Sequence, residues 1–283
     1  MSSLDLRSVA RPLAESLRGS MPAYPHLYDA AIETWRSRMR NEHGSSRVFS
    51  SLAEQMTAAG FDSSVVDEVR AFAKEEEKHG ALCGSVVEAL GGEAIVPVLP
   101  EAPFPWHTDL TPLEGVLCNL LSISCLSETI AVALIGAERF EMPEGRLRDL
   151  LTEIWADEVG HARFGWRIVS DRVEGLSFES KARLSEYLRA AFAHLEEHEL
   201  AHLPLAAQPP AEGVSLGLCS GKDARALFYD TIRSAILPPL DALGLSATNA
   251  WNTRYSRMNF SQASGTSPMS FSAPARSTRT NEN

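Results

Sequence analysis

Two short motifs in the chain pair a glutamate with a histidine three residues later. Glu76 is followed by His79, and Glu158 is followed by His161. Residues three apart on a helix project from the same face, so each pair can present a carboxylate and an imidazole to one metal ion. Glutamate and histidine are also common on exposed helix faces, so the surroundings of each pair decide whether a metal site is predicted.

Both motifs fall on the apolar stripe of a predicted helix. Steps of three and four residues from Glu76 and His79 reach Val65, Val69, Phe72, Cys83, Val86 and Leu90. The same steps from Glu158 and His161 reach Leu147, Leu151, Ile154, Gly165 and Ile168. An ionised carboxylate is costly to bury unless it is paired or coordinated. Two acids on two core stripes therefore predict a compensating cation.

Two further glutamates, Glu42 and Glu128, lie on the apolar stripes of two other predicted helices. They precede the glutamates of the two motifs by 34 and 30 residues, so the pattern occurs twice. Four carboxylates and two imidazoles suit iron or manganese. The set contains no cysteine, which argues against structural zinc, and no histidines four apart around a glutamate, which a zinc protease needs. The alternative is that the six residues are surface charges or core ion pairs.

Helices must position these residues, because apolar residues recur at helical spacing and almost nowhere alternate as in a strand. The predicted helices span residues 28–59, 62–90, 111–140, 143–173, 179–202 and 222–243. The third helix has the clearest start, a capping box formed by Thr111, Pro112 and Glu114. Four prolines between residues 93 and 110 predict a long crossover connection.

These elements predict one all-α domain over residues 1–245. Its core is expected at residues 28–173, and the extra helices at 179–243 could cover an end of that core and shape a cavity. Residues 246–283 are rich in Ser, Thr and Asn, and we predict a mobile tail there.

The composition excludes several functional classes. The 283 residues include 37 acids and 26 bases, for a net charge of −11, so a nucleic-acid partner is not expected. The four cysteines lack CxxC spacing and the N-terminus lacks a secretory signal, which favours a reduced cytoplasmic protein. The apolar run 116–135 contains Glu128, Asn119 and three serines, which favours a buried helix over a membrane span.

On its six candidate ligands, the chain resembles the ferritin-like di-iron carboxylate superfamily over residues 28–173. The resemblance implies a ferritin-like four-helix bundle with a long crossover and additional C-terminal helices. It also implies two iron ions, as Fe²⁺ or Fe³⁺, with manganese as the alternative. One metal would be held mainly by Glu42, Glu76 and His79, and the other by Glu128, Glu158 and His161, with two glutamates bridging.

The resemblance also assigns neighbouring residues. Glu75 and Asp157 each precede a ligand glutamate, at the place where an acid hydrogen-bonds a metal-bound histidine of the opposite helix in many members. The alternative for both is a solvated acid. Cys83 stands where the ribonucleotide reductase small subunit has its radical tyrosine, and Ile154 where arylamine N-oxygenases have another histidine, so both subfamilies are disfavoured. Candidates for an apolar pocket wall are Phe49, Cys83, Leu121, Cys125, Val132 and Ile154.

The expected function is a non-haem di-iron oxidase or oxygenase that activates O₂ to oxidise a small organic substrate, with no catalytic side chain beyond the metal ligands. An external electron donor such as a ferredoxin is implied, a homodimer is a further expectation, and no membrane partner is expected. The alternatives are a ferroxidase or rubrerythrin-like peroxide-reducing protein, and a metal-free helical interaction protein. His194, His198 and His202 favour the polar edge of an amphipathic helix, with a second metal site as the alternative.

Overall fold

The computed structural model describes residues 3–98 and 103–256, and this part of the chain is mostly helical. The longest helices are α2 (Tyr28–Ala58), α3 (Ser63–Ala89), α6 (Arg146–Val173) and α7 (Phe178–His202). A further long helical segment consists of α4 (Pro112–Leu120), a π-helical stretch (Leu121–Ser127) and α5 (Glu128–Glu141). The prediction of an all-α protein is confirmed.

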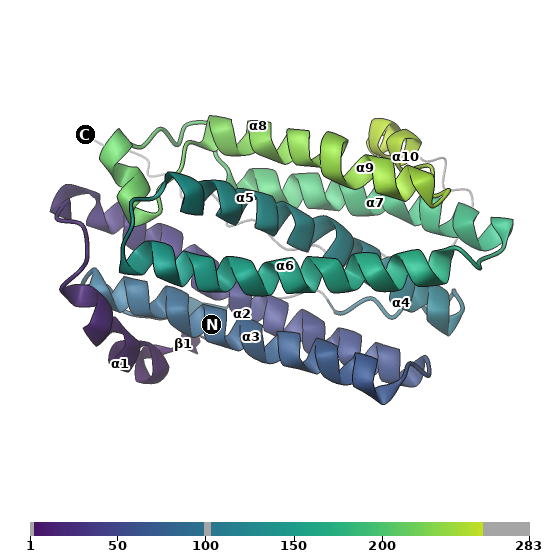
Figure 1. The fold of residues 1–283 in the computed structure, drawn as a ribbon, viewed down its shortest axis with the longest axis horizontal. Coiled ribbons are helices and arrows are strands. Elements are labelled where there is room, and N and C mark those ends of the chain that lie inside the picture. The colour runs from purple at the N-terminus through teal and green to yellow at the C-terminus, as the bar shows by residue number, and fades with distance from the viewer. Residues whose placement is uncertain (1–2, 99–102, 257–283) are drawn as a thin grey trace, which may run out of the picture.

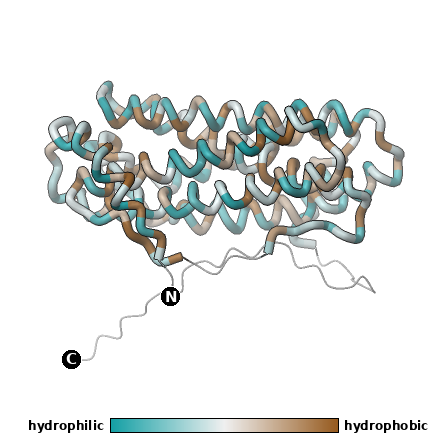
Figure 2. The backbone as a smooth tube through the Cα atoms, turned by 90° about the horizontal axis from the view of Figure 1, so that it is seen from below, coloured by the Kyte–Doolittle hydropathy of each residue, from teal (hydrophilic) through white to brown (hydrophobic). Residues whose placement is uncertain are grey.

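Two pairs of long helices form the centre of the molecule. α2 packs along α3, and α5 packs along α6 (Figure 1). The short turns at residues 59–62 and 142–145 make each pair antiparallel, and Gly60 provides a positive φ of 78° in the first turn. Hydrophilic and hydrophobic residues alternate along the helices in Figure 2, as expected when each helix has one solvent face and one core face.

The extra C-terminal helices form a second layer. α8 (Gly221–Thr231) packs against α5, whereas α7 packs against α4 and the π-helical stretch. α8 continues through a π-helical turn (Ile232–Ile236) into α9 (Leu237–Ala242), as Figure 1 shows. The helices predicted for this part of the chain are therefore present.

The predicted tail begins too early, because its first residues form α10 (Ala247–Thr253). Trp251 of α10 is buried, and its ring lies 5.5 Å from that of Phe192 on α7. Packing of one tryptophan thus orders a helix too short to show a clear apolar period. The rest of the predicted tail, residues 257–283, lies outside the described residues.

The periodicity of the sequence did not predict the N-terminal elements. α1 (Arg7–Arg18) packs against α3, and β1 (Ser3–Asp5) pairs antiparallel with β2 (Ile95–Pro97). Short 3-10 helices occur at Pro25–Leu27 and Ala211–Leu216. A strand of three residues is too short to establish an alternating pattern.

The helical segment Pro112–Glu141 is, among the described residues, the one long and apolar enough to cross a membrane. Core helices of soluble proteins meet the same criterion, and this segment has buried Glu114 and Glu128. Its start is the predicted capping box: the Thr111 hydroxyl accepts from the Glu114 amide at 3.3 Å, and the Glu114 carboxylate accepts from the Thr111 amide at 3.1 Å. The segment is weak evidence for a membrane protein.

Candidate metal centre

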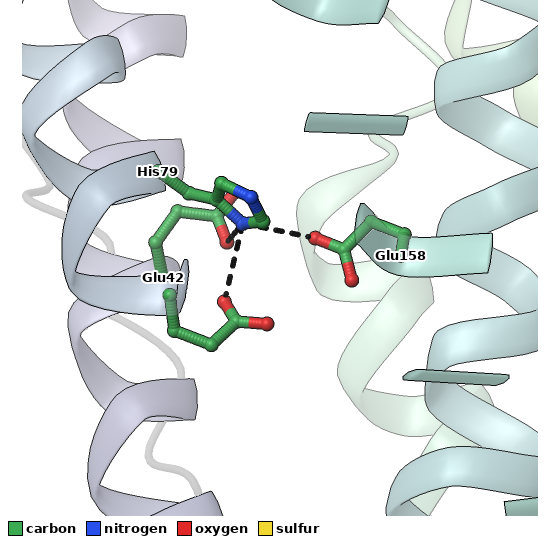
Figure 3. A group of neighbouring side chains, drawn as sticks. Glu42, His79 and Glu158 are labelled. Atoms are coloured by element: carbon green, nitrogen blue, oxygen red, sulfur yellow. Dashed lines mark ion pairs between the residues drawn. The ribbon is translucent and has the colours of Figure 1, made fainter. Parts of the chain in front are cut away.

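The six predicted ligands converge between the two central helix pairs and form two overlapping groups. Within each group, the ligand atoms lie within 4.8 Å of one another. The groups are Glu42, Glu76, His79 and Glu158, and Glu76, Glu128, Glu158 and His161. Figure 3 shows Glu42, His79 and Glu158 pointing toward one another from three helices. Glu76 and Glu158 belong to both groups, so each of these carboxylates could contact two cations. The buried groups could hold a metal ion.

Burial leaves part of this cluster without hydrogen bonds. The side chain of Glu76 is 1% exposed, and neither of its oxygens receives a hydrogen bond. His79 Nδ1 is buried and also lacks one, although it lies 3.4 Å from Glu158 Oε1. Buried polar groups are almost always hydrogen-bonded, and exceptions call for an explanation. A cation at the centre would satisfy these atoms.

The histidines contact the two acids that directly precede the candidate ligand glutamates. His79 Nε2 lies 3.1 Å from Asp157 Oδ2, and His161 Nε2 lies 2.9 Å from Glu75 Oε2. Each contact joins α3 to α6, the opposite-helix arrangement that the sequence predicted. The carboxylates can fix a proton on Nε2, which would leave each Nδ1 facing the glutamate cluster.

The cluster strongly perturbs its own protonation. Burial, together with repulsion from other glutamates, raises the pKa values of Glu42 and Glu128 well above their ordinary range. Burial would lower the pKa of the histidines, but the adjacent carboxylates of Glu158 and Glu76 raise it to about 11 for His79 and about 12 for His161. Without a metal, protons on these groups therefore offset the negative charge.

A cavity of about 1130 Å³ reaches this centre. Glu42 and Glu128 line it, together with Phe49, Cys83 and Ile154 from the predicted pocket. Its walls come from all of the central helices and also from α7 and α8 of the second layer. The cavity gives a molecule of moderate size access to two of the candidate ligands.

The other three predicted pocket residues, Leu121, Cys125 and Val132, do not line this cavity. Leu121 and Cys125 are fully buried in the apolar core, and the carbonyl of Val132 accepts a hydrogen bond from Trp155. The prediction assumed a regular α-helix through this region. Since Leu121–Ser127 is π-helical, residues around it point in other directions than an α-helical count indicates.

Cys83 is a buried free thiol in the cavity wall. Burial and the nearby carboxylate of Glu42 raise its pKa well above the usual value, so the thiol is neutral. Lining residues that sequence periodicity did not single out include Ile123, Leu195 and Leu227. The last two belong to the second layer, and only the packing of that layer places them near the site.

No protein-family model matches the chain, and the comparison with curated proteins found no match. Function is therefore inferred from the geometry of the site.

Proposed function

We propose that this protein is a ferritin-like di-iron carboxylate enzyme that activates O₂ and oxidises a small organic molecule. The observation that carries the proposal is the cavity that reaches Glu42 and Glu128. Ligand pockets are typically concave and largely apolar with a few polar groups. Phe49 and Ile154 provide apolar walls beside the two carboxylates.

The ligand set fits two iron ions. Four carboxylates and two imidazoles are the set found in ferritin-like bundles, and the unsatisfied oxygens of Glu76 support occupancy by a cation. Glu76 and Glu158 would serve both ions, while Glu42 and His79 would bind one of them. Glu128 and His161 would bind the other. Two divalent ions would balance all four carboxylates.

The bound irons would supply redox chemistry toward O₂, with electrons returned by an external donor of the ferredoxin type. The chain's own residues would hold and shield that chemistry. Asp157 and Glu75 would keep the two imidazoles oriented through their Nε2 atoms. Phe49 and Ile154 would exclude water around the organic substrate in the cavity.

A ferroxidase or peroxide-reducing protein would use the same ligands but needs no organic cavity. A metal-free interaction protein would leave the two oxygens of Glu76 buried and unsatisfied. We therefore favour the oxygenase or oxidase.

Anaerobic loading with Fe²⁺, followed by metal analysis and O₂ consumption, tests the proposal. We expect two irons per chain and rapid O₂ uptake, and Glu128→Ala should lose the uptake while retaining helical circular dichroism. The matched control is Glu153→Gln, because Glu153 is a half-exposed acid of α6 that pairs with Lys78. Iron at less than one atom per chain would contradict the metal centre. Oxidation of iron alone, with no organic compound consumed, would favour the ferroxidase.

A further inference from the structure

The C-terminal half of α7 carries three histidines on one face. His194, His198 and His202 are spaced four residues apart, and all three line the cavity. Ring centroids lie 6.2 Å apart for His194 and His198, and 4.6 Å apart for His198 and His202. The sequence favoured a polar helix edge here, but position on a cavity wall gives these side chains access to a ligand.

The last two histidines enclose a recognisable pattern. Residues 198–202 read His-Glu-Leu-Ala-His, which is the His-Glu-x-x-His spacing that the carboxylate ligand set lacks. On a helix this spacing puts two imidazoles on one face, where they can bind a single zinc ion, with the intervening glutamate beside it. Glu199 lines the same cavity as His198 and His202.

From this arrangement we propose that His198 and His202 form a second metal site, which takes a divalent transition cation of the zinc type. The site does not depend on the proposed oxidase function. Imidazole ligands favour zinc, nickel or copper over magnesium, calcium or manganese. The two metal centres would therefore differ in chemistry, one rich in oxygen ligands and the other built on nitrogen.

A hydrogen bond at His202 prepares that residue for metal binding. Its Nδ1 lies 2.9 Å from the backbone carbonyl oxygen of His198. A carbonyl can only accept, so Nδ1 carries the hydrogen, and a neutral ring then keeps its lone pair on Nε2. Metal-ligating histidines usually donate their other ring nitrogen to a carbonyl or carboxylate in this way.

Zinc titration of the full-length chain, followed by calorimetry, tests the site in three variants. His202→Gln and His198→Gln should each lose one bound Zn²⁺ per chain relative to wild type. His26→Gln is the matched control, because His26 is an exposed histidine that does not line the cavity and forms a 3.9 Å ion pair with Glu212. Zinc at the carboxylate centre should be unaffected in all three, and Fe²⁺ loading measures that centre separately.

A crystal of the full-length protein soaked in zinc provides a readout without substitutions. An anomalous peak about 2.0–2.1 Å from both Nε2 atoms would establish the site. Unchanged zinc stoichiometry in His198→Gln and His202→Gln would overturn the proposal. It would equally be overturned if His194→Gln removed the bound zinc and His202→Gln did not, since the ligand pair would then be another one.

Discussion

Buried carboxylates in this protein fall into two groups that differ in how their charge is balanced. Glu114 and Glu196 each contact an arginine at 2.5 Å, Arg183 and Arg254 respectively. Glu76 is equally buried but receives no hydrogen bond, and its ion-pair partners among the described residues are the cluster histidines. The same residue type is thus neutralised by permanent cations in one region and left to protons or a metal ion in another.

The difference shows which acids are structural and which are available for chemistry. An arginine is always charged, so the acids paired with it are satisfied whatever the protein binds. A histidine gives up its proton when a metal competes for the ring nitrogen. Only the second arrangement can change its charge state in response to a ligand.

The largest expected effect is at Glu76, because it belongs to both ligand groups. Glu76→Ala should abolish retention of iron after anaerobic loading and desalting, as measured by elemental analysis. Glu77→Ala is the matched control, since Glu77 is an exposed neighbour on the same helix. Normal iron content in Glu76→Ala would contradict the claim that Glu76, unlike the arginine-paired acids, binds a metal ion.

A smaller effect is expected at Asp157, which contacts the cluster only through His79. Asp157→Asn should weaken iron binding by about 10–100-fold, the range seen when a partner of a ligating histidine is removed. Competition with a chromophoric chelator measures the affinity. Asp149→Asn, at an exposed position of the same helix, should bind iron as wild type does.

Stability should distinguish the two kinds of acid in the opposite sense. Glu114→Gln should lower the free energy of unfolding by about 1–3 kcal/mol, because it weakens charge-assisted hydrogen bonds with Arg183. In metal-free protein, Glu76→Gln should lower that free energy less than Glu114→Gln does, because Glu76 receives no hydrogen bond that would be lost and the neighbouring histidines can release a proton. Urea titrations measure both. A larger loss for Glu76→Gln than for Glu114→Gln would contradict the comparison.

The smallest effect is a pH dependence from Glu114. Hydrogen bonds from Ser180, Arg183 and Thr111 outweigh burial and lower its pKa from 4.5 to about 2. A lowered pKa contributes stability that is fully present above the unfolded value and is lost as pH falls through the folded one. The urea concentration at the unfolding midpoint should therefore decrease as the pH is lowered from about 4.5 to about 2. This decrease in the midpoint should be smaller in Glu114→Gln than in wild type. An equal decrease in the two proteins would show that other titrating groups cause it.

The clustering of the candidate ligands was predictable from sequence because much of it depends on local geometry. Residues three apart share a helix face, so His79 and His161 could be placed with their glutamates before any packing was known. The roles of Glu75 and Asp157 were predicted from the family resemblance, and both acids contact a histidine of the opposite helix. For the candidate ligands, helical spacing and position on an apolar stripe were enough to predict that they share a buried site.

The pocket was less predictable because it depends on packing between distant segments. The π-helical stretch, in which Leu121 and Cys125 do not line the cavity, packs closely against α6. A Cβ atom on Gly165 of α6 would come within 2.2 Å of Ser124 Cβ. Such a contact is visible only when both helices are placed. Leu195 lines the cavity because α7 docks beside it, and hydrophobic periodicity does not predict how one helix docks on others.

The contacts of Glu196 set a minimum C-terminal extent for a fragment of this protein that keeps its packing. Tyr229 donates to this carboxylate from α8, while Arg254 and Tyr255 donate from the residues that follow α10. An expression fragment ending at residue 245 would keep only the first of these donors and would uncover the apolar ring of Phe192. A fragment that keeps these three donors must therefore extend at least through Tyr255.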